Sequence, residues 1–208
     1  MRFFGRRRLL DNRDFWNRRY RTDPALGSGV GSRGEVAAYK RNLVETEWRS
    51  IGGGSVLDIG FGDLEMLDIS VFDRYLGVDI SDVAIERAQR RYPQHQFVHA
   101  DFGGRREPDV PAADLVLCFD VLIHQFDPEA YQRIVERIVR RTRRVGIVAG
   151  YNREPQNPGP ITTFHEPVRR TLRRCGAREI SRIGSYRGIA VMRFEGPAGP
   201  TVATDPAA

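Results

Sequence analysis

Short apolar runs alternate with segments of helical periodicity through most of this chain. Five such runs lie at residues 56–59, 75–80, 97–100, 114–119 and 145–149. Strands that are buried on both faces read as continuous apolar runs, and parallel strands need a crossover, usually a helix, between them. The alternation therefore predicts an α/β fold built on a mainly parallel sheet, with helices covering both faces.

The segments between and after these runs complete a seven-stranded sheet. Apolar residues recur at helical spacing over 35–49, and Ser81 can cap a helix that runs to about residue 91. Two more helices are expected over 128–141 and 167–175. The remaining expected elements are a proline-rich loop and two closing strands, at 151–166, 178–184 and 189–194.

The length of 208 residues fits one domain. We expect this α/β domain to span residues 35–195. Residues 1–34 would form an N-terminal cap or lid, and residues 196–208, which are rich in Gly, Pro, Ala and Thr, a disordered tail. No apolar run is long enough to cross a membrane, and the basic start lacks the apolar stretch of a signal peptide, so a cytoplasmic location is expected.

The charge is strongly skewed toward arginine. Of the 33 basic residues only Lys40 is a lysine, and the net charge is +6. Arginines cluster at 6–8, 140–144 and 169–174. We interpret these clusters as solvated helix faces, although a basic surface also attracts polyanions. Two cysteines cannot build a disulfide scaffold, and no cluster of ligating residues predicts a metal site.

Three acids follow one another at strand ends and predict a ligand pocket. The first strand runs into Asp58-Ile59-Gly60-Phe61-Gly62, where the glycines let a ligand approach the backbone. Asp79 and Asp101 end the next two strands. In open parallel sheets, ligands bind at these carboxyl ends. The third glycine of a dinucleotide fingerprint is absent, because Glu65 stands there, so the pattern favours a nucleoside without pyrophosphate.

The order of these motifs resembles the class I S-adenosylmethionine (SAM)-dependent methyltransferases. It reads VLDIGFGD at 56–63, YLGVDIS at 75–81, HADF at 99–102 and DLVLCFDVLIH at 114–124. The resemblance implies a Rossmann-like fold, SAM as cofactor and S-adenosylhomocysteine (SAH) as product. It implies cofactor contacts for the following residues: Asp58, Gly60, Gly62 and Asp63 at the methionine end, Asp79 at the ribose, Ile80, Asp101 and Phe102 at the adenine, and Phe119 beside them.

The glycine-rich stretch 27–34 is a further candidate for the methionine end. Arg33 and the backbone of Ser28 and Gly29 could bind the methionine carboxylate, since arginine pairs bidentately with carboxylates. The alternative is a loop that only positions the following helix. Tyr20 and Trp16, just upstream, are candidates for a lid over the cofactor.

Transfer of a methyl group to a neutral hydroxyl requires a base. His124, just past the fourth strand, is the first candidate because histidine titrates near neutral pH. Its alternative role is a contact with the cofactor. Asp120 is the alternative acid, base or orienting group, and His165, after the proline-rich loop, is a second candidate base.

A single domain without a macromolecule-binding extension favours a small acceptor. We expect O-methylation of a sugar, a glycan end or a natural-product scaffold, with N-methylation and an anionic acceptor left open. RNA or protein as the acceptor is one alternative, and a non-catalytic SAM-binding subunit is another. Nucleic acid is disfavoured as a partner. A homodimer stays open, because the apolar helix face at 129–141 could serve a dimer as well as a sheet.

Overall fold

A seven-stranded sheet forms the centre of the computed structural model, which describes residues 11–154, 162–163 and 165–197. The strand order is β3-β2-β1-β4-β5-β7-β6, in which neighbouring strands are parallel from β3 to β5 and antiparallel at β7 and β6. The strands are β1 (Ser55–Ile59), β2 (Arg74–Asp79), β3 (Gln96–His99), β4 (Ala113–Cys118), β5 (Thr142–Gly150), β6 (Arg178–Tyr186) and β7 (Ile189–Glu195). The predicted fold class is confirmed.

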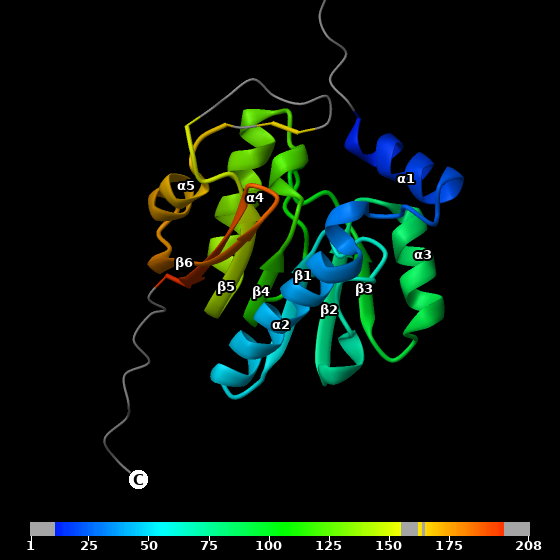
Figure 1. Cartoon of the computed structure of the whole chain (residues 1–208), viewed down its shortest axis with the longest axis horizontal. Helices are drawn as coiled ribbons and strands as arrows, with labels where there is room; N and C mark the ends of the chain where they lie inside the picture. Colours follow the sequence, from blue (N-terminus) through cyan, green and yellow to red (C-terminus); the bar gives the residue numbers. More distant parts are fainter. Residues whose placement is uncertain (1–10, 155–161, 164, 198–208) are drawn as a thin grey trace, which may run out of the picture.

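Helices cover both faces of the sheet (Figure 1). They are α1 (Asn12–Thr22), α2 (Gly34–Ser50), α3 (Asp82–Arg91), α4 (Pro128–Arg141) and α5 (Val168–Arg174). The last four lie where the sequence predicted them. The sequence indicated no helix in the first 26 residues, but α1 forms there, with the Asp11 side chain accepting a hydrogen bond from the Asp14 N–H as an N-cap. Its strongly polar composition gives the helix a weak apolar pattern, which is why periodicity misses it.

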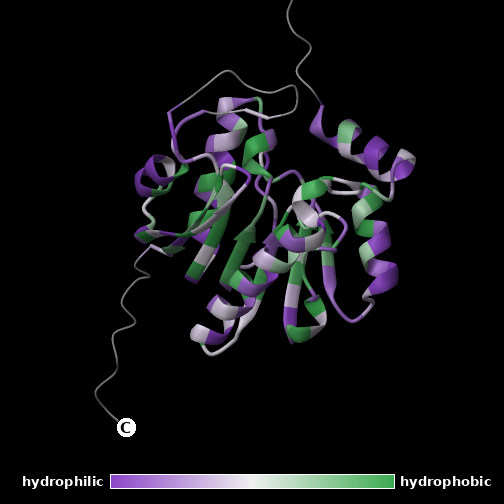
Figure 2. Cartoon of the chain, viewed as in Figure 1, coloured by the Kyte–Doolittle hydropathy of each residue, from purple (hydrophilic) through white to green (hydrophobic). Residues whose placement is uncertain are grey.

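Successive side chains along the strands point to opposite faces of the sheet and form one apolar core on each face. Val56, Leu115 and Leu117 pack on the face covered by α1, α2 and α3, whereas Leu57 and Val116 pack on the face covered by α4 and α5. Figure 2 shows the apolar interior of the sheet and the mixed surfaces of the helices. The apolar face of α4 lies in the second core, so within one chain it covers the sheet.

The strand order reverses between β1 and β4, and this places a crevice at their carboxyl ends. β1 pairs with β2 on one side and with β4 on the other, and the chain leaves the two strands in opposite directions. Ligands of open α/β sheets bind at such a switch point. In the part of the chain that the structure describes, no helix is long and apolar enough to cross a membrane.

The antiparallel strand β7 closes the second core with Phe194. Its side chain is fully buried and lies against Gly146 of β5, where a Cβ would come within 2.1 Å of the ring. The glycine therefore makes room for the aromatic ring in the centre of the closing strands.

We expect Phe194→Ala to lower the free energy of unfolding by about 3–5 kcal/mol, because it removes a buried ring and leaves a cavity. Denaturant unfolding measures this change. Val71→Ala is the control, since Val71 is 40% exposed and its truncation should change stability by less than about 0.5 kcal/mol. Equal stability of the two variants would contradict the described packing.

Candidate functional site

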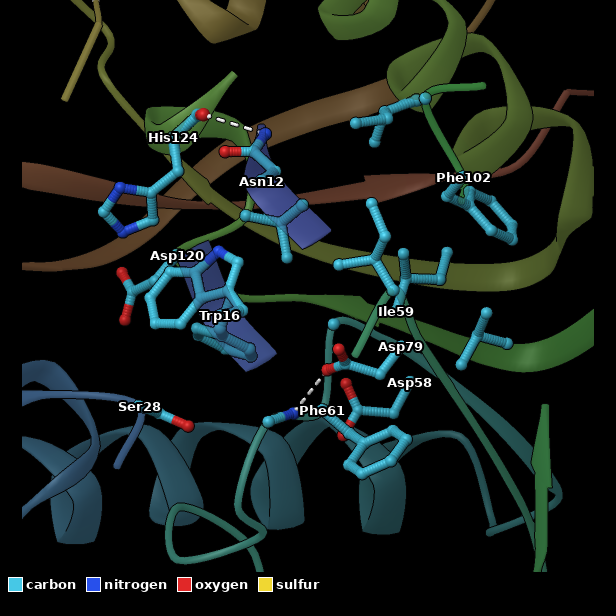
Figure 3. Close-up of a pocket in the computed structure, with 18 of the residues that line it drawn as sticks. Asn12, Trp16, Ser28, Asp58, Ile59, Phe61, Asp79, Phe102, Asp120 and His124 are labelled. Atoms are coloured by element: carbon cyan, nitrogen blue, oxygen red, sulfur yellow. Dashed lines mark hydrogen bonds between the residues drawn. The ribbon is translucent and has the colours of Figure 1, made fainter. Parts of the chain in front are cut away.

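A cavity opens at the carboxyl ends of β1, β2 and β4 and under α1 (Figure 3). Residues from the ends of these strands line it, together with one face of α1. The lining includes Asn12, Trp16, Tyr20, Ser28, Ser32, Asp58, Gly60, Phe61, Gly62, Asp79, Ile80, Asp101, Phe102, Phe119, Asp120, His124 and Gln125. The structure thus brings most of the residues singled out in the sequence into one cavity.

Asp79 lies at the wall of this cavity and is held by backbone donors. Its carboxylate accepts hydrogen bonds from the Gly62 N–H at 2.9 Å and the Ser81 N–H at 2.8 Å. Burial raises its pKa to about 6, and the two N–H groups oppose that rise. The acid at the end of β2 is therefore fixed against the glycine turn after β1, and each oxygen keeps a lone pair for a ligand hydroxyl.

Asp58 is more deeply buried and pairs with a tyrosine that the sequence did not single out. The hydroxyl of Tyr75 donates to Asp58 at 2.8 Å, and both residues are almost fully buried. Burial raises the pKa of Asp58 to about 7, against the effect of the Tyr75 hydrogen bond. Gly60 follows in a left-handed conformation with φ 74°, where a Cβ would lie 2.1 Å from Val121. No larger residue fits at this turn.

The predicted adenine end lies beyond Asp79. Asp101 accepts a hydrogen bond from the Gly103 N–H at 2.9 Å, and Phe102 is buried with Arg141 over its ring. Arg137 of α4 donates to the carbonyl of Phe102 at 2.8 Å and so holds this loop on the second core. Asp101 is exposed and keeps acceptor capacity toward the cavity.

Aromatic and polar side chains form the opposite end of the cavity. Trp16 contacts the His124 ring edge to face at 5.3 Å and stacks on Tyr20 at 5.9 Å. The amide of Asn12 donates to the His124 carbonyl at 3.2 Å and contacts Gln125. Asn12, Trp16 and Tyr20 are spaced four residues apart, so a single face of α1 covers the cavity. Figure 3 shows Trp16 between Ser28 and His124.

Asp120 stands at the same end in a left-handed backbone conformation with φ 59°. Lys40 of α2 donates to one carboxylate oxygen at 2.5 Å, and the hydroxyl of Tyr186 of β6 donates to the other at 2.5 Å. Lys40 is completely buried and also donates to the carbonyl of Gly31 at 2.7 Å. Burial lowers the pKa of Lys40, and the adjacent Asp120 opposes that shift.

The glycine-rich segment is tied to the turn after β1 through Ser28 and Asp63. Ser28 donates its N–H to Asp63 at 2.8 Å, and its hydroxyl accepts from the Asp63 N–H at 3.0 Å. Arg33 donates to Asp63 at 2.6 Å. Burial raises the pKa of Asp63, but these hydrogen bonds lower it by more and hold it below the usual range. Gly29 adopts φ 102° at the start of a short turn of helix.

Four of the predicted site residues do not line the main cavity: Gly29, Arg33, Asp63 and His165. Arg33 and Asp63 instead line a neighbouring cavity beside α3. His165 contacts the Tyr131 ring at 4.9 Å, and its Nε2 lies 2.6 Å from the carbonyl of Gln125. It therefore contacts Gln125, a residue of the cavity lining, without lining the cavity itself. Its role as a base stays a prediction.

Sequence reasoning missed Asn12, Gln125, Tyr75, Lys40 and Tyr186. The first two and Tyr186 carried no motif. Lys40 did carry a signal, because it is the sole lysine beside 32 arginines. Among the described residues, no group of three or more His, Cys, Asp or Glu side chains is arranged to hold a metal ion.

Comparison with known proteins identifies the class. Residues 56–146 match the family model described as a methyltransferase domain. Magnesium protoporphyrin IX methyltransferase from Synechocystis PCC 6803, solved with bound SAH, superposes with a TM-score of 0.66 at 21% identity, over 88% of this chain and 97% of that one. The N-methyltransferase NodS from Bradyrhizobium japonicum WM9, also with SAH, gives 0.61 at 17% identity, over 77% and 87%.

A third structure, 1,6-didemethyltoxoflavin-N1-methyltransferase from Burkholderia thailandensis, gives a TM-score of 0.64 at 18% identity, over 89% of this chain and 87% of that one. No curated protein sequence matches the chain. Residues 56–146 thus form a methyltransferase domain, and the fold is similar to that of the class I SAM-dependent methyltransferases that the sequence motifs resemble. SAM is the cofactor that the sequence resemblance implies, and all three of these compared structures hold its product, SAH.

The residues of the cavity fit this cofactor. At Gly60 and Gly62 the side chains of Val121 and Ser28 take the place that a Cβ would need, so both pack directly on the turn that lines the cavity. Beside it, the Asp79 carboxylate faces the cavity in the position that suits two ribose hydroxyls.

We expect SAM affinity to fall as the pH drops from 7 to 5. Because burial raises the pKa of Asp79 to about 6, its carboxyl is protonated below that pH, and a neutral acid accepts hydroxyl hydrogen bonds more weakly than a carboxylate. Calorimetric titration of SAM at several pH values measures the change. Asp79→Asn is the control and should lose the step near pH 6. If both proteins lost SAM affinity over the same pH range, the titrating group would be another one, such as Asp58.

Proposed function

We propose that this enzyme transfers the methyl group of SAM to a hydroxyl of a small molecule, such as a sugar, a glycan end or a natural-product scaffold. One observation carries the proposal. A single cavity joins the three strand-end acids that suit a nucleoside to an end built of His124, Asp120 and Trp16, which suits an acceptor. The cytoplasmic location expected from the sequence stays a prediction.

Our proposal gives each cofactor residue a role that suits its place along the cavity. Asp79 would accept from the ribose hydroxyls, and Asp101 from the adenine amine beside Phe102 and Ile80. Asp58 and the turn at Gly60–Gly62 would hold the methionine end. SAM supplies a methyl group whose C–S bond breaks, with its electron pair going to sulfur, as the acceptor oxygen bonds to carbon. Alignment alone can contribute roughly 7–11 kcal/mol to such a displacement.

His124 would accept the proton that the acceptor hydroxyl loses. Its ring lies at the cavity wall, in contact with Trp16, and its backbone carbonyl is held by Asn12. These contacts fix the ring at the end of the cavity away from Asp79, which Figure 3 shows. A positioned base contributes roughly 10²–10⁴-fold to a proton transfer.

Ion pairing of the arginine clusters supports a small acceptor over RNA. Arg140 and Arg141 both pair with Glu107 at 2.7 Å, and Arg174 pairs with Glu166 at 2.5 Å. Acids in this arrangement offset the positive charge that a phosphate backbone would need. Two of the compared proteins are named for small molecules, magnesium protoporphyrin IX and 1,6-didemethyltoxoflavin.

We expect His124→Ala to lower turnover at least 100-fold while the Kd of SAM stays within about twofold, because the variant loses the base and keeps the nucleoside contacts. Rates of SAH formation and calorimetric binding of SAM measure the two quantities. His95→Ala is the control, since His95 lies among Tyr75 and Tyr92, outside the lining of this cavity. Turnover of His124→Ala at the wild-type rate would rule out the base role.

The proposed lid function of α1 has a separate test. Trp16→Ala should weaken SAM binding about tenfold, because it removes the ring that covers the cavity. Phe15→Ala is the matched control, because the neighbouring ring does not line that cavity. Unchanged affinity in Trp16→Ala would leave α1 without a role in cofactor binding.

The acceptor class is tested by supplying labelled SAM and the enzyme to a lysate of the source organism and fractionating the products. The proposal predicts label in the small-molecule or glycan fraction. Label in RNA or protein would replace it with the macromolecular alternative. Binding of SAM without transfer to any fraction would favour a non-catalytic subunit.

A further inference from the structure

The sole lysine of the chain lies in a fully buried position beside the active site. Among 33 basic residues only Lys40 is not arginine. Its side chain is 0% exposed, and its ammonium lies 4.2 Å from the Tyr186 ring centroid and 5.6 Å from that of Phe119. A compact ammonium fits between these rings, whereas a planar guanidinium is larger and presents its donors in a fixed fork. The site therefore selects lysine in a chain that otherwise uses arginine.

Lys40 joins three segments that meet at the cavity. It belongs to α2, donates to the carbonyl of Gly31 in the glycine-rich segment, and donates to Asp120 after β4. A buried ammonium is costly unless it is paired and hydrogen-bonded, and these two acceptors and the faces of the two rings satisfy it. Lys40 does not line the cavity, so its charge acts on the site through Asp120.

Asp120 is the member of this cluster that faces the cavity. Its side chain is 22% exposed, and Figure 3 shows its carboxylate beside Trp16 and on the same side as His124. Lys40 and the Tyr186 hydroxyl each occupy one oxygen, so the side chain is held from two directions. Each oxygen keeps acceptor capacity toward the cavity. The left-handed backbone at Asp120 is strained for a residue with a Cβ, and strain of this kind persists where the surroundings fix it.

We propose that Lys40 and Tyr186 are positioning residues that hold the Asp120 carboxylate toward the methyl acceptor, where it accepts a hydrogen bond from the hydroxyl or amine that receives the methyl group. The proposal rests on the proposed function and restricts the chemical class of the group that can accept the methyl. A carboxylate in this place orients a group that carries a proton and repels an anionic oxygen. The acceptor is therefore a protic group and not a carboxylate or a phosphate.

The test compares three variants with a matched control. Tyr186→Phe removes one donor to Asp120 and keeps the ring, Lys40→Met removes the other donor with little change in volume, and Asp120→Asn removes the charge. Tyr39→Phe is the control, because the Tyr39 hydroxyl also bridges α2 and β6, by accepting from the Ser185 N–H at 3.1 Å, but it lies outside the cavity.

The first readout needs no acceptor. The protein is labelled with ¹³C at its aspartate carboxyl carbons, and the Asp120 resonance is assigned by its loss in Asp120→Asn. We expect this resonance to move in Tyr186→Phe and in Lys40→Met and to stay in place in Tyr39→Phe. A resonance that moves in neither of the first two variants would overturn the positioning role.

The second readout is the rate of SAH formation with the small-molecule fraction of the source organism as acceptor. Tyr186→Phe should lower kcat about tenfold, with the Kd of SAM within about twofold of the wild-type value. The double variant Lys40→Met/Asp120→Asn should be no slower than Asp120→Asn alone, because Lys40 acts through Asp120. Losses that multiply, or a wild-type rate in Tyr186→Phe, would overturn the proposal.

Failure of the proposed function gives a different result. The wild-type enzyme would then form no SAH with this fraction, and the Asp120 resonance would alone decide whether Lys40 and Tyr186 hold the carboxylate. If Lys40→Met fails to fold, Tyr186→Phe still tests the claim, because it deletes a single oxygen atom.

Discussion

Burial of ionisable carboxylates at the ends of adjacent parallel strands is the constraint on which the rest of this site depends. Asp79 has its pKa raised from 3.8 to about 6, and one pKa unit corresponds to about 1.4 kcal/mol. Keeping it ionised at neutral pH thus costs about 3 kcal/mol of stability, a cost that sets in as the pH rises from about 4 to 6. The hydrogen bonds from the Gly62 and Ser81 N–H groups keep this cost from being larger, and the apolar cores on the two faces of the sheet offset it.

The same constraint organises the chain around the site. Gly62 must leave its N–H free for Asp79, and this fixes the turn after β1. Ser28 then ties the glycine-rich segment to that turn, and α1, which precedes the segment, is placed over the cavity. A ligand that binds Asp79 would therefore lie in a cavity whose walls come from the strand ends, the turn after β1 and α1, although these segments are far apart in the sequence.

The sequence predicted the sheet well, because buried parallel strands leave continuous apolar runs, as at 115–119, and because acids at the ends of such strands stand out. It did not predict α1, because this helix is polar on most of its surface and has no apolar stripe to reveal the period. Only one row of side chains, Asn12, Trp16 and Tyr20, lines the cavity. It also could not pair Tyr75 with Asp58 or Tyr186 with Asp120, since such contacts depend on strand order and not on spacing. For Arg33 the sequence suggested a ligand contact that the structure does not favour. Its charge suited the carboxylate of the cofactor, but its guanidinium pairs with Asp63 of this chain.

A crystal structure of the enzyme with SAH bound would decide these residue roles. We expect the ribose hydroxyls on Asp79, the adenine against Phe102 and Ile80, and the sulfur turned toward Asp120 and His124. A nucleoside bound elsewhere, or one with its sulfur turned away from Asp120 and His124, would contradict it.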